Sequence, residues 1–143
     1  MKTRLLLTSI MLLTLTLMAF SQSTPVNKTK YKIVVQLVSG DTAVQRGALT
    51  QVHHALLEAP NSKIEVVCHS GGIVILQSSK TTLANEIKDL QNQGVQFAAC
   101  ANSMRLRKID KSDIVSQAII VPAGVIEIVD KQSKGWAYLR AGN

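Results

Sequence analysis

The sequence has little of what several common functions require. Aromatic residues make up only 3% of the chain, which offers no stacking platform for single-stranded nucleic acid. Neither a Gly-x-Gly-x-x-Gly motif nor a phosphate-binding loop is present, and there is no Gly-x-Ser-x-Gly elbow. These absences argue against a nucleotide-binding protein and against a hydrolase with such an elbow.

Residues that commonly bind metals are also few. The chain has two cysteines and three histidines, and the adjacent His53 and His54 on an expected helix point about 100° apart. No histidine or cysteine is spaced from another in the way that zinc sites require. We therefore expect neither a metal ion nor another cofactor.

The first 21 residues resemble a secretory signal peptide. Two basic residues precede an apolar run from Leu5 to Phe20, and Ala19 and Ser21 place small residues where signal peptidases cleave. The run is shorter than the roughly 20 residues needed to span a bilayer, and an uncleaved anchor is the main alternative. We expect residues 1–21 to be removed and the product to reach the bacterial periplasm without stable membrane insertion.

Residues 22–30 are polar, and we expect them to form a flexible lead before a single domain at residues 31–143. The formal net charge of the whole chain is +7, but its lysines and arginines are mostly spread along it singly. Such spacing is typical of ordinary solubilising charge, and we expect no nucleic-acid partner.

From residue 31 onward, strand-like apolar runs alternate with segments of helical periodicity. The expected strands are 33–38, 64–68, 95–99, 118–121 and a short edge strand at 136–139. Helices are expected after a cap at Asp41, from Leu83 to Asn92 after a cap at Thr82, and around Val125 to Val129, with short helical pieces at 73–76 and 110–115. Because the strands are apolar on both faces, this alternation predicts an α/β fold, a three-layer α/β/α sandwich with a mainly parallel sheet of about five strands.

Four turns follow the expected strands, and ligands of such sheets gather at the carboxyl ends of the strands. The turns are Ser39-Gly40-Asp41, Cys68-His69-Ser70-Gly71-Gly72, Cys100-Ala101-Asn102 and Pro122-Ala123-Gly124. The edge of the sheet formed by the carboxyl ends of the strands is therefore the expected functional site.

Cys100 is the strongest candidate for a functional residue. It lies where a strand ends and a helix is expected to begin, and Arg105, Arg107 and Lys108 follow shortly after. A helix N-terminus and nearby cations both lower the pKa of a thiol and favour the nucleophilic thiolate. On this interpretation Asn102 and Arg105 are candidate binding residues. The alternative is a buried structural cysteine.

The turn after the second strand contains further candidates. Cys68 is either a core residue or, if the two strands are neighbours, a disulfide partner of Cys100 in an oxidising compartment. His69 can orient or deprotonate a nearby thiol, or it can satisfy local backbone groups. The segment Ser70-Gly71-Gly72 can present backbone amides to an anion, although paired glycines are also common in turns.

Three segments of the chain resemble the DsrE/DsrF-like family of small sulfur-relay proteins. They are the strand and glycine turn at 64–72, the segment 94–104 around Cys100, and the segment 121–128 ahead of the Gly-Trp-Ala-Tyr sequence at 135–138. The position of Cys100 is similar to that of the sulfur-carrying cysteine of the DsrE and TusD proteins. The resemblance implies that Cys100 carries sulfur as a persulfide. It also implies a thiol-bearing protein or a small sulfur donor as partner, and a trimer or hexamer.

Two features depart from this resemblance. Well-known sulfur-relay members act in the cytoplasm, whereas this chain has an export signal. Cys68 is a second cysteine in a turn where the family does not lead us to expect one, and a disulfide there would disable Cys100. Three hypotheses follow: an exported sulfur carrier, a non-catalytic periplasmic binding or assembly module, and a redox switch based on a Cys68–Cys100 disulfide. In the first hypothesis, His69 and the basic turn assist Cys100, and the protein acts as a sulfur carrier rather than as an enzyme that turns over a substrate.

Overall fold

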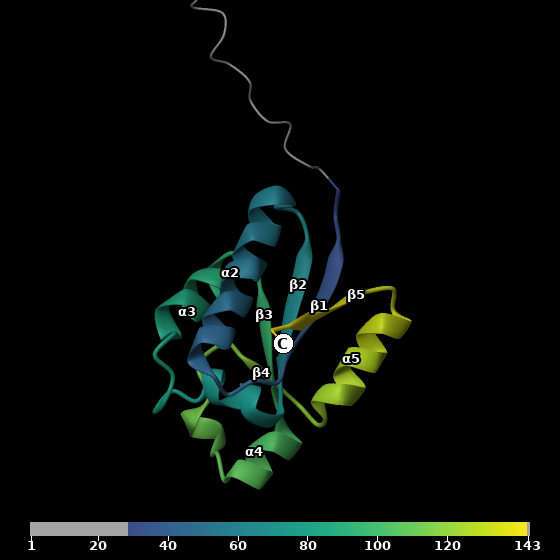
Figure 1. Cartoon of the computed structure of the whole chain (residues 1–143). Coiled ribbons are helices and arrows are strands. Elements are labelled where there is room, and N and C mark those ends of the chain that lie inside the picture. Colours follow the sequence, from purple (N-terminus) through teal and green to yellow (C-terminus); the bar gives the residue numbers. More distant parts are fainter. Residues whose placement is uncertain (1–28, 143) are drawn as a thin grey trace, which may run out of the picture.

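The computed structural model describes residues 29–142, so the expected signal peptide at 1–21 and most of the expected lead at 22–30 lie outside the described residues. Within this part of the chain, five strands form one parallel sheet with helices on both faces (Figure 1). The predicted three-layer α/β architecture is confirmed. No helix among these residues is both long and apolar enough to cross a membrane.

The strand order determines which segments of the chain meet. The strands are β1 (Lys32–Leu37), β2 (Lys63–Cys68), β3 (Gln96–Cys100), β4 (Ile119–Val121) and β5 (Ala137–Ala141). Their order is β4-β3-β2-β1-β5, and every neighbouring pair is parallel. The expected short edge strand is confirmed as β5. The carboxyl ends of all five strands therefore lie at one edge of the sheet.

Helices connect the strands. They are α2 (Thr42–Glu58), η1 (Ser70–Leu76), α3 (Ala84–Asn92), α4 (Ala101–Arg107), η2 (Lys111–Asp113) and α5 (Gly124–Ser133), where η marks a 3-10 helix. As expected, Asp41 caps α2, because its carboxylate accepts the amide of Val44 at 3.0 Å. The expectation for Thr82 is wrong: Leu83 is the N-cap of α3, and its amide donates to the hydroxyl of Thr81.

The two faces of the sheet have apolar cores of different size. Successive residues of a strand point to opposite faces. The larger core includes Cys68 and Ala99 and lies beneath α2, α3 and η1. The smaller core includes Ala98 and is covered by α5, which contributes Ile128 and lies across the sheet from α2 and α3 (Figure 1). Because Cys100 follows Ala99, its side chain points to the α5 face.

Candidate functional site

The carboxyl edge of the sheet places Cys100 between the starts of two helices. Cys100 is the last residue of β3 and the N-cap of α4, which confirms the predicted junction of strand and helix. Gly124, the first residue of α5, lies beside it. Cys100 is 4% exposed. Helix α4 follows β3 without an intervening loop, so the cysteine stays at the sheet edge.

Hydrogen-bond donors from both helix starts point at the Cys100 sulfur. The amide of Gly124 donates to Sγ at 3.2 Å. The hydroxyl of Ser103 and the amides of Asn102 and Ser103 also donate to this sulfur. These amides belong to the first turns of α5 and α4, where backbone N–H groups have no partner within the helix. The sulfur therefore takes the place that a capping side-chain oxygen usually has.

These donors lower the pKa of the Cys100 thiol. Burial by itself raises the pKa because it disfavours the charged thiolate, but the hydrogen bonds from Ser103, Gly124 and Asn102 outweigh burial. The thiolate is the nucleophilic form of cysteine. The environment of Cys100 therefore favours nucleophilic chemistry, even though the residue is buried.

Ser103 is a site residue that the sequence analysis missed. It is buried, and its hydroxyl oxygen accepts the amide of Ser70 at 2.8 Å, which leaves the hydroxyl hydrogen free to point at Cys100. Ser70 has a φ of 52°, in the left-handed region, where β2 gives way to η1. The signal in the sequence was the position of Ser103 three residues after the N-cap, from which side chains often reach back to the cap.

His69 lies in a second hydrogen-bonded group on the same face of the sheet. The hydroxyl of Tyr138 donates to Gln36 Oε1, so Gln36 Nε2 is free to donate to His69 Nε2 at 2.8 Å. His69 Nε2 then accepts, and Nδ1 carries the hydrogen and donates to the Ser70 hydroxyl at 3.1 Å. Burial lowers the pKa of His69 and favours the neutral ring. Gln36 and Tyr138 come from β1 and β5, and nothing in the sequence indicated that they meet.

The imidazole of His69 forms no hydrogen bond with the Cys100 thiol, which it was expected to orient or deprotonate. Both of its ring nitrogens are engaged, by Gln36 and Ser70, and the donors at the Cys100 sulfur are other groups. Gly124 lies between the two residues, since its amide donates to Cys100 and a Cβ added to it would meet His69 Cβ at 3.0 Å. His69 therefore packs against the first turn of α5.

The glycine pair of the second turn allows close backbone packing, which engages part of the backbone that was expected to bind an anion. A Cβ on Gly72 would lie 2.1 Å from Leu37 O, and one on Gly71 would lie 2.8 Å from Gly40 N. The amide of Gly72 already donates to two backbone carbonyls, at 2.8 and 2.9 Å. The glycines thus let the turn after β2 lie against the turn after β1, and the Gly72 amide is not available to an anion.

The two expected binding residues on α4 have different places. Asn102 contributes its backbone amide to the Cys100 sulfur. Arg105 is exposed and lines a hollow of about 230 Å³ that Ile120 also lines. Ile120 is the register partner of Ala99 and points away from the Cys100 face, so this hollow lies on the other side of β4. Arg105 is therefore not among the groups that bond to the thiol.

Cys68 and Cys100 do not form the disulfide that the sequence left open. Their strands are neighbours, but Cys68 is the register partner of Ala99, one residue before Cys100. The two side chains consequently point to opposite faces of the sheet, with Cys68 in the larger core. Both thiols are free, and burial raises the pKa of Cys68 far above its ordinary value.

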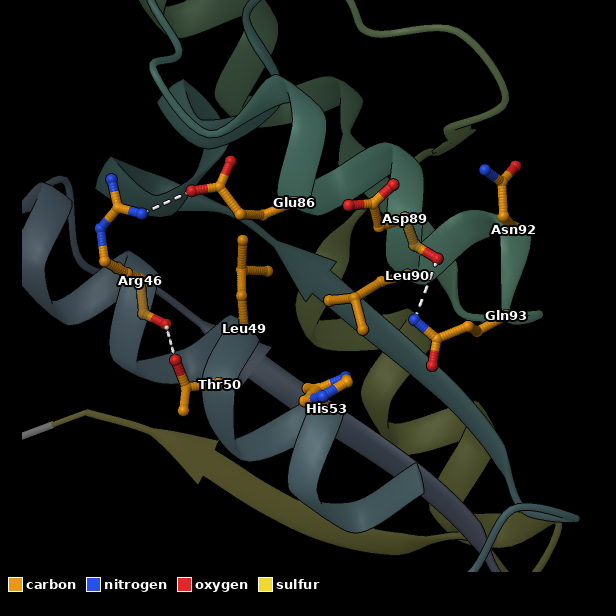
Figure 2. A pocket seen from close by; sticks show the side chains of 9 residues that line it. All are labelled: Arg46, Leu49, Thr50, His53, Glu86, Asp89, Leu90, Asn92 and Gln93. Atoms are coloured by element: carbon orange, nitrogen blue, oxygen red, sulfur yellow. Dashed lines mark hydrogen bonds and ion pairs between the residues drawn. The ribbon is translucent and has the colours of Figure 1, made fainter. Parts of the chain in front are cut away.

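A separate hollow of about 560 Å³ lies between α2 and α3. Figure 2 shows its lining side chains coming from these two helices, including Leu49, Leu90 and the ion pair between Arg46 and Glu86. None of the residues that bond to the Cys100 thiol lines it. Within residues 29–142, no three histidine, cysteine, aspartate or glutamate side chains are grouped so that they could hold a metal ion.

The chain matches a known family and solved structures. The model of the DsrE/DsrF-like family matches residues 30–141. The structure is similar to that of MTH1491, a protein of unknown function from Methanobacterium thermoautotrophicum, with 30% sequence identity and a TM-score of 0.74. That match covers 77% of this chain and 98% of the other.

A second structure is similar in fold. It is the conserved protein of unknown function BT1422 from Bacteroides thetaiotaomicron, with 15% identity, a TM-score of 0.58, and coverage of 76% of this chain and 93% of the other. None of the curated proteins matches this chain. From the family match over nearly all described residues, the chain belongs to the DsrE/DsrF-like family, which is generally linked to sulfur relay.

Proposed function

We propose that this protein accepts sulfane sulfur on Cys100 and passes it on from a persulfide. The observation that carries the proposal is the convergence of donors from Ser103 and Gly124 on the Cys100 sulfur, which lowers the pKa of the thiol. A sulfur carrier needs a thiolate twice, first as the nucleophile that attacks the donor and later as the group that leaves.

The proposed transfer consists of two exchange steps without net oxidation. The Cys100 thiolate attacks the sulfane sulfur of a polysulfide or thiosulfate. A new S–S bond forms, the donor S–S bond breaks, and its electron pair leaves on the shortened polysulfide or on sulfite. The thiolate of a partner protein then attacks the outer sulfur of the persulfide, and Cys100 leaves as thiolate. The donors around Cys100 assist this second step, because a thiol of lower pKa leaves faster.

The low exposure of Cys100 limits which donors and acceptors can react with it. With 4% of the residue exposed, a small inorganic donor or a narrow segment of a partner reaches the sulfur more easily than a broad surface does. Both kinds of partner, a small sulfur donor and a thiol-bearing protein, therefore fit the proposal.

Export and self-assembly form the second part of the proposal. The N-terminal pattern supports cleavage after Ser21 and a periplasmic location. The α5 residues Val125, Ile126 and Val129 are 54%, 64% and 60% exposed, and exposed apolar patches often mark contacts between chains. They support self-assembly, for which the family resemblance implies a trimer or hexamer. They also favour the second candidate function, an assembly module without sulfur chemistry.

Sulfur loading followed by intact mass tests the proposal. The protein is purified without reductant and incubated with polysulfide, and loading appears as a gain of sulfur mass that a reductant removes. We expect the Cys100→Ser variant to lose this gain and the Cys68→Ser variant, the matched control, to keep it. Undiminished loading of the Cys100→Ser variant would remove Cys100 from the mechanism, and no loading of the wild type would leave the assembly module.

A further inference from the structure

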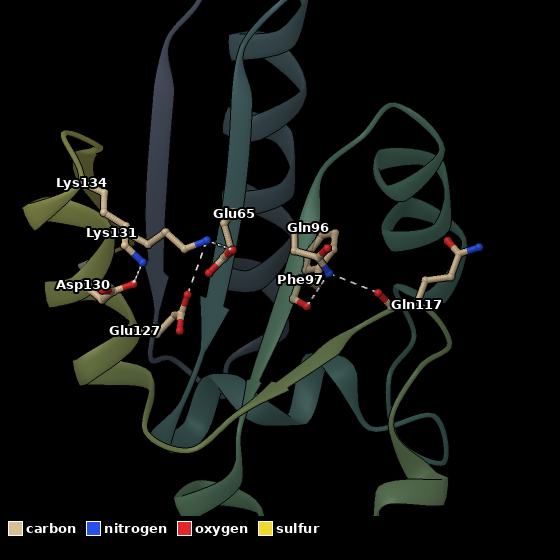
Figure 3. Close-up of polar contacts among 8 residues, drawn as sticks. All are labelled: Glu65, Gln96, Phe97, Gln117, Glu127, Asp130, Lys131 and Lys134. Atoms are coloured by element: carbon tan, nitrogen blue, oxygen red, sulfur yellow. Dashed lines mark hydrogen bonds and ion pairs between the residues drawn. The ribbon is translucent and has the colours of Figure 1, made fainter.

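Glu65 is a buried carboxylate on the face of the sheet that α5 covers. It lies in β2 and is 2% exposed. Its register partners in the neighbouring strands, Val34 and Gln96, carry no charge. Lys131 of α5 extends toward the sheet, and its Nζ lies 2.5 Å from Glu65 Oε2 (Figure 3).

Lys131 is held by three groups at its charged end. Besides the contact with Glu65, its Nζ lies 3.4 Å from Glu127 Oε1 and 4.5 Å from the centre of the Trp136 ring. Burial alone lowers the pKa of Lys131, but the two carboxylates raise it above its ordinary value. The ammonium is therefore charged, and it is restrained by two carboxylates and by the face of an aromatic ring.

This ion pair does more to fix the position of α5 than to stabilise the fold. Removing two charges from water costs about as much free energy as their attraction returns, so buried pairs often add little stability. The second carboxylate oxygen, Glu65 Oε1, is buried and has no hydrogen-bond partner among the described residues, which adds to the cost. Such a pair indicates a requirement for one particular placement of the helix.

Apolar burial by itself locates α5 weakly. Gly124 and Ile128 are its buried residues, whereas Val125, Ile126 and Val129 are exposed. Hydrophobic contact is not directional, so one buried isoleucine opposes lifting of the helix more than sliding along the sheet. An ion pair to a strand residue opposes both movements.

We propose that Glu65 and Lys131 are positioning residues that hold α5 where the amide of Gly124 donates to the Cys100 sulfur. Gly124 and Lys131 belong to the same helix, about two turns apart, so a shift at one end is transmitted to the other. Such a shift lengthens the 3.2 Å contact between Gly124 N and Cys100 Sγ. The inference rests on the proposed function for its biological meaning, because it names what sets the reactivity of the carrier cysteine.

The pH dependence of Cys100 alkylation tests this role in the full chain. Rates of reaction with iodoacetamide are measured across pH by peptide mass spectrometry for the wild type and the Glu65→Gln and Lys131→Met variants. We expect the midpoint of the pH–rate curve for Cys100 to rise by about one pH unit in both variants. Below the midpoint, the reaction is then about tenfold slower than in the wild type. Lys134→Met is the matched control, because Lys134 forms an exposed pair with Asp130 on the same helix at 2.6 Å. It should leave the midpoint unchanged.

Two further variants and two spectroscopic readouts separate positioning from stability. Lys131→Arg keeps the charge and should retain the wild-type midpoint, whereas Ser103→Ala removes a direct donor and should raise it. Trp136 is the single tryptophan of the chain, so its fluorescence reports loss of the Lys131 contact, while circular dichroism reports the fold. The proposal is overturned if Glu65→Gln and Lys131→Met lower the melting temperature but leave the Cys100 midpoint unchanged. If Glu65→Gln does not fold, the two Lys131 variants decide without any change in the sheet.

Alkylation needs no sulfur donor, so this inference and the proposed function fail separately. A shifted midpoint without sulfur loading of Cys100 would support the positioning role and contradict the sulfur carrier. An unchanged midpoint with normal sulfur loading would contradict the positioning role and support the sulfur carrier.

Discussion

Cys68 and Cys100 end neighbouring strands at the same edge of the sheet, but their surroundings act on the thiol in opposite directions. Both residues are buried, with Cys68 0% and Cys100 4% exposed. The Cys68 sulfur has a long contact of 3.9 Å with the carbonyl of Val66 and otherwise lies in an apolar core. The Cys100 sulfur accepts hydrogen bonds from the starts of two helices.

The two cysteines show that the face of the strand, more than its end, decides the chemistry. Burial raises the pKa of Cys68. Burial also acts to raise the pKa of Cys100, but the amides and the hydroxyl directed at its sulfur lower it. Cys68 is aligned with Ala99, one residue before Cys100, so the two cysteines face opposite sides of the sheet. The Cys68 side faces an apolar core, and the Cys100 side faces two helix N-termini.

The largest expected effect is the difference in alkylation rate between the two thiols. In the folded protein at pH 7, we expect iodoacetamide to modify Cys100 at least about a hundred times faster than Cys68. The reason is that Cys68 is fully buried with a raised pKa, whereas the pKa of Cys100 is lowered. Peptide mass spectrometry over a time course measures both rates. Unfolding in urea should make the rates equal, and equal rates in the folded protein would contradict the contrast.

A smaller effect is expected on stability, and there the order is reversed. Cys68→Ser should lower the free energy of unfolding by about 1–3 kcal/mol, because it places a hydroxyl in an apolar core. Cys100→Ser should cost less than about 1 kcal/mol, because the donors from Gly124 and Ser103 suit a serine oxygen at a helix N-cap. Urea denaturation followed by Trp136 fluorescence measures both costs. If Cys100→Ser lowered the free energy of unfolding more than Cys68→Ser does, the contrast between the two cysteine environments would be contradicted.

The smallest expected effect is a pH dependence of stability with opposite sign for the two thiols. The folded pKa of Cys68 lies above the unfolded value of about 8.5, so its contribution is present below that pH. It is lost as pH rises, by at most about 1.4 kcal/mol per pH unit. The folded pKa of Cys100 is depressed, so its contribution is present above about pH 8.5 and is lost as pH falls through the folded pKa.

Differences between the wild type and each serine variant isolate these two contributions. Unfolding is measured across a pH series for all three proteins, and titrations of the other groups cancel in the differences. The Cys68 difference should decrease with rising pH and the Cys100 difference should increase. Two differences with the same slope would mean that the two sulfur environments are alike.

The fold and the junction of strand and helix at Cys100 were predictable because they depend on short-range patterns. Apolar strand runs alternating with helical segments predicted the parallel sheet. The last strand, β5, was expected at an edge of the sheet and lies there. The cap at Asp41 and the junction at Cys100 depend on a few adjacent residues, and both are confirmed. Thr82 failed as a cap because Thr81, one residue earlier, has the hydroxyl that meets the Leu83 amide.

Partners from distant strands could not be predicted in the same way. Gln36 contacts both His69 and Tyr138 only because β1 lies between β2 and β5 in the sheet. Glu65 reads in the sequence as one polar residue inside an apolar strand, and its pairing with Lys131 depends on where α5 crosses the sheet. Loops and helices separate these residues, so local periodicity carries no information about their contact.

The sequence by itself determined that this chain alternates strands and helices and that two cysteines end strands. It also placed Cys100 at a helix start, since each of these features depends on residues that are neighbours in the chain. The tertiary structure alone decided that Cys68 and Cys100 point to opposite faces and that α5 begins beside the second thiol. The physical reason is that side chains alternate within one strand, while the register between strands and the placement of a helix depend on packing across the whole domain.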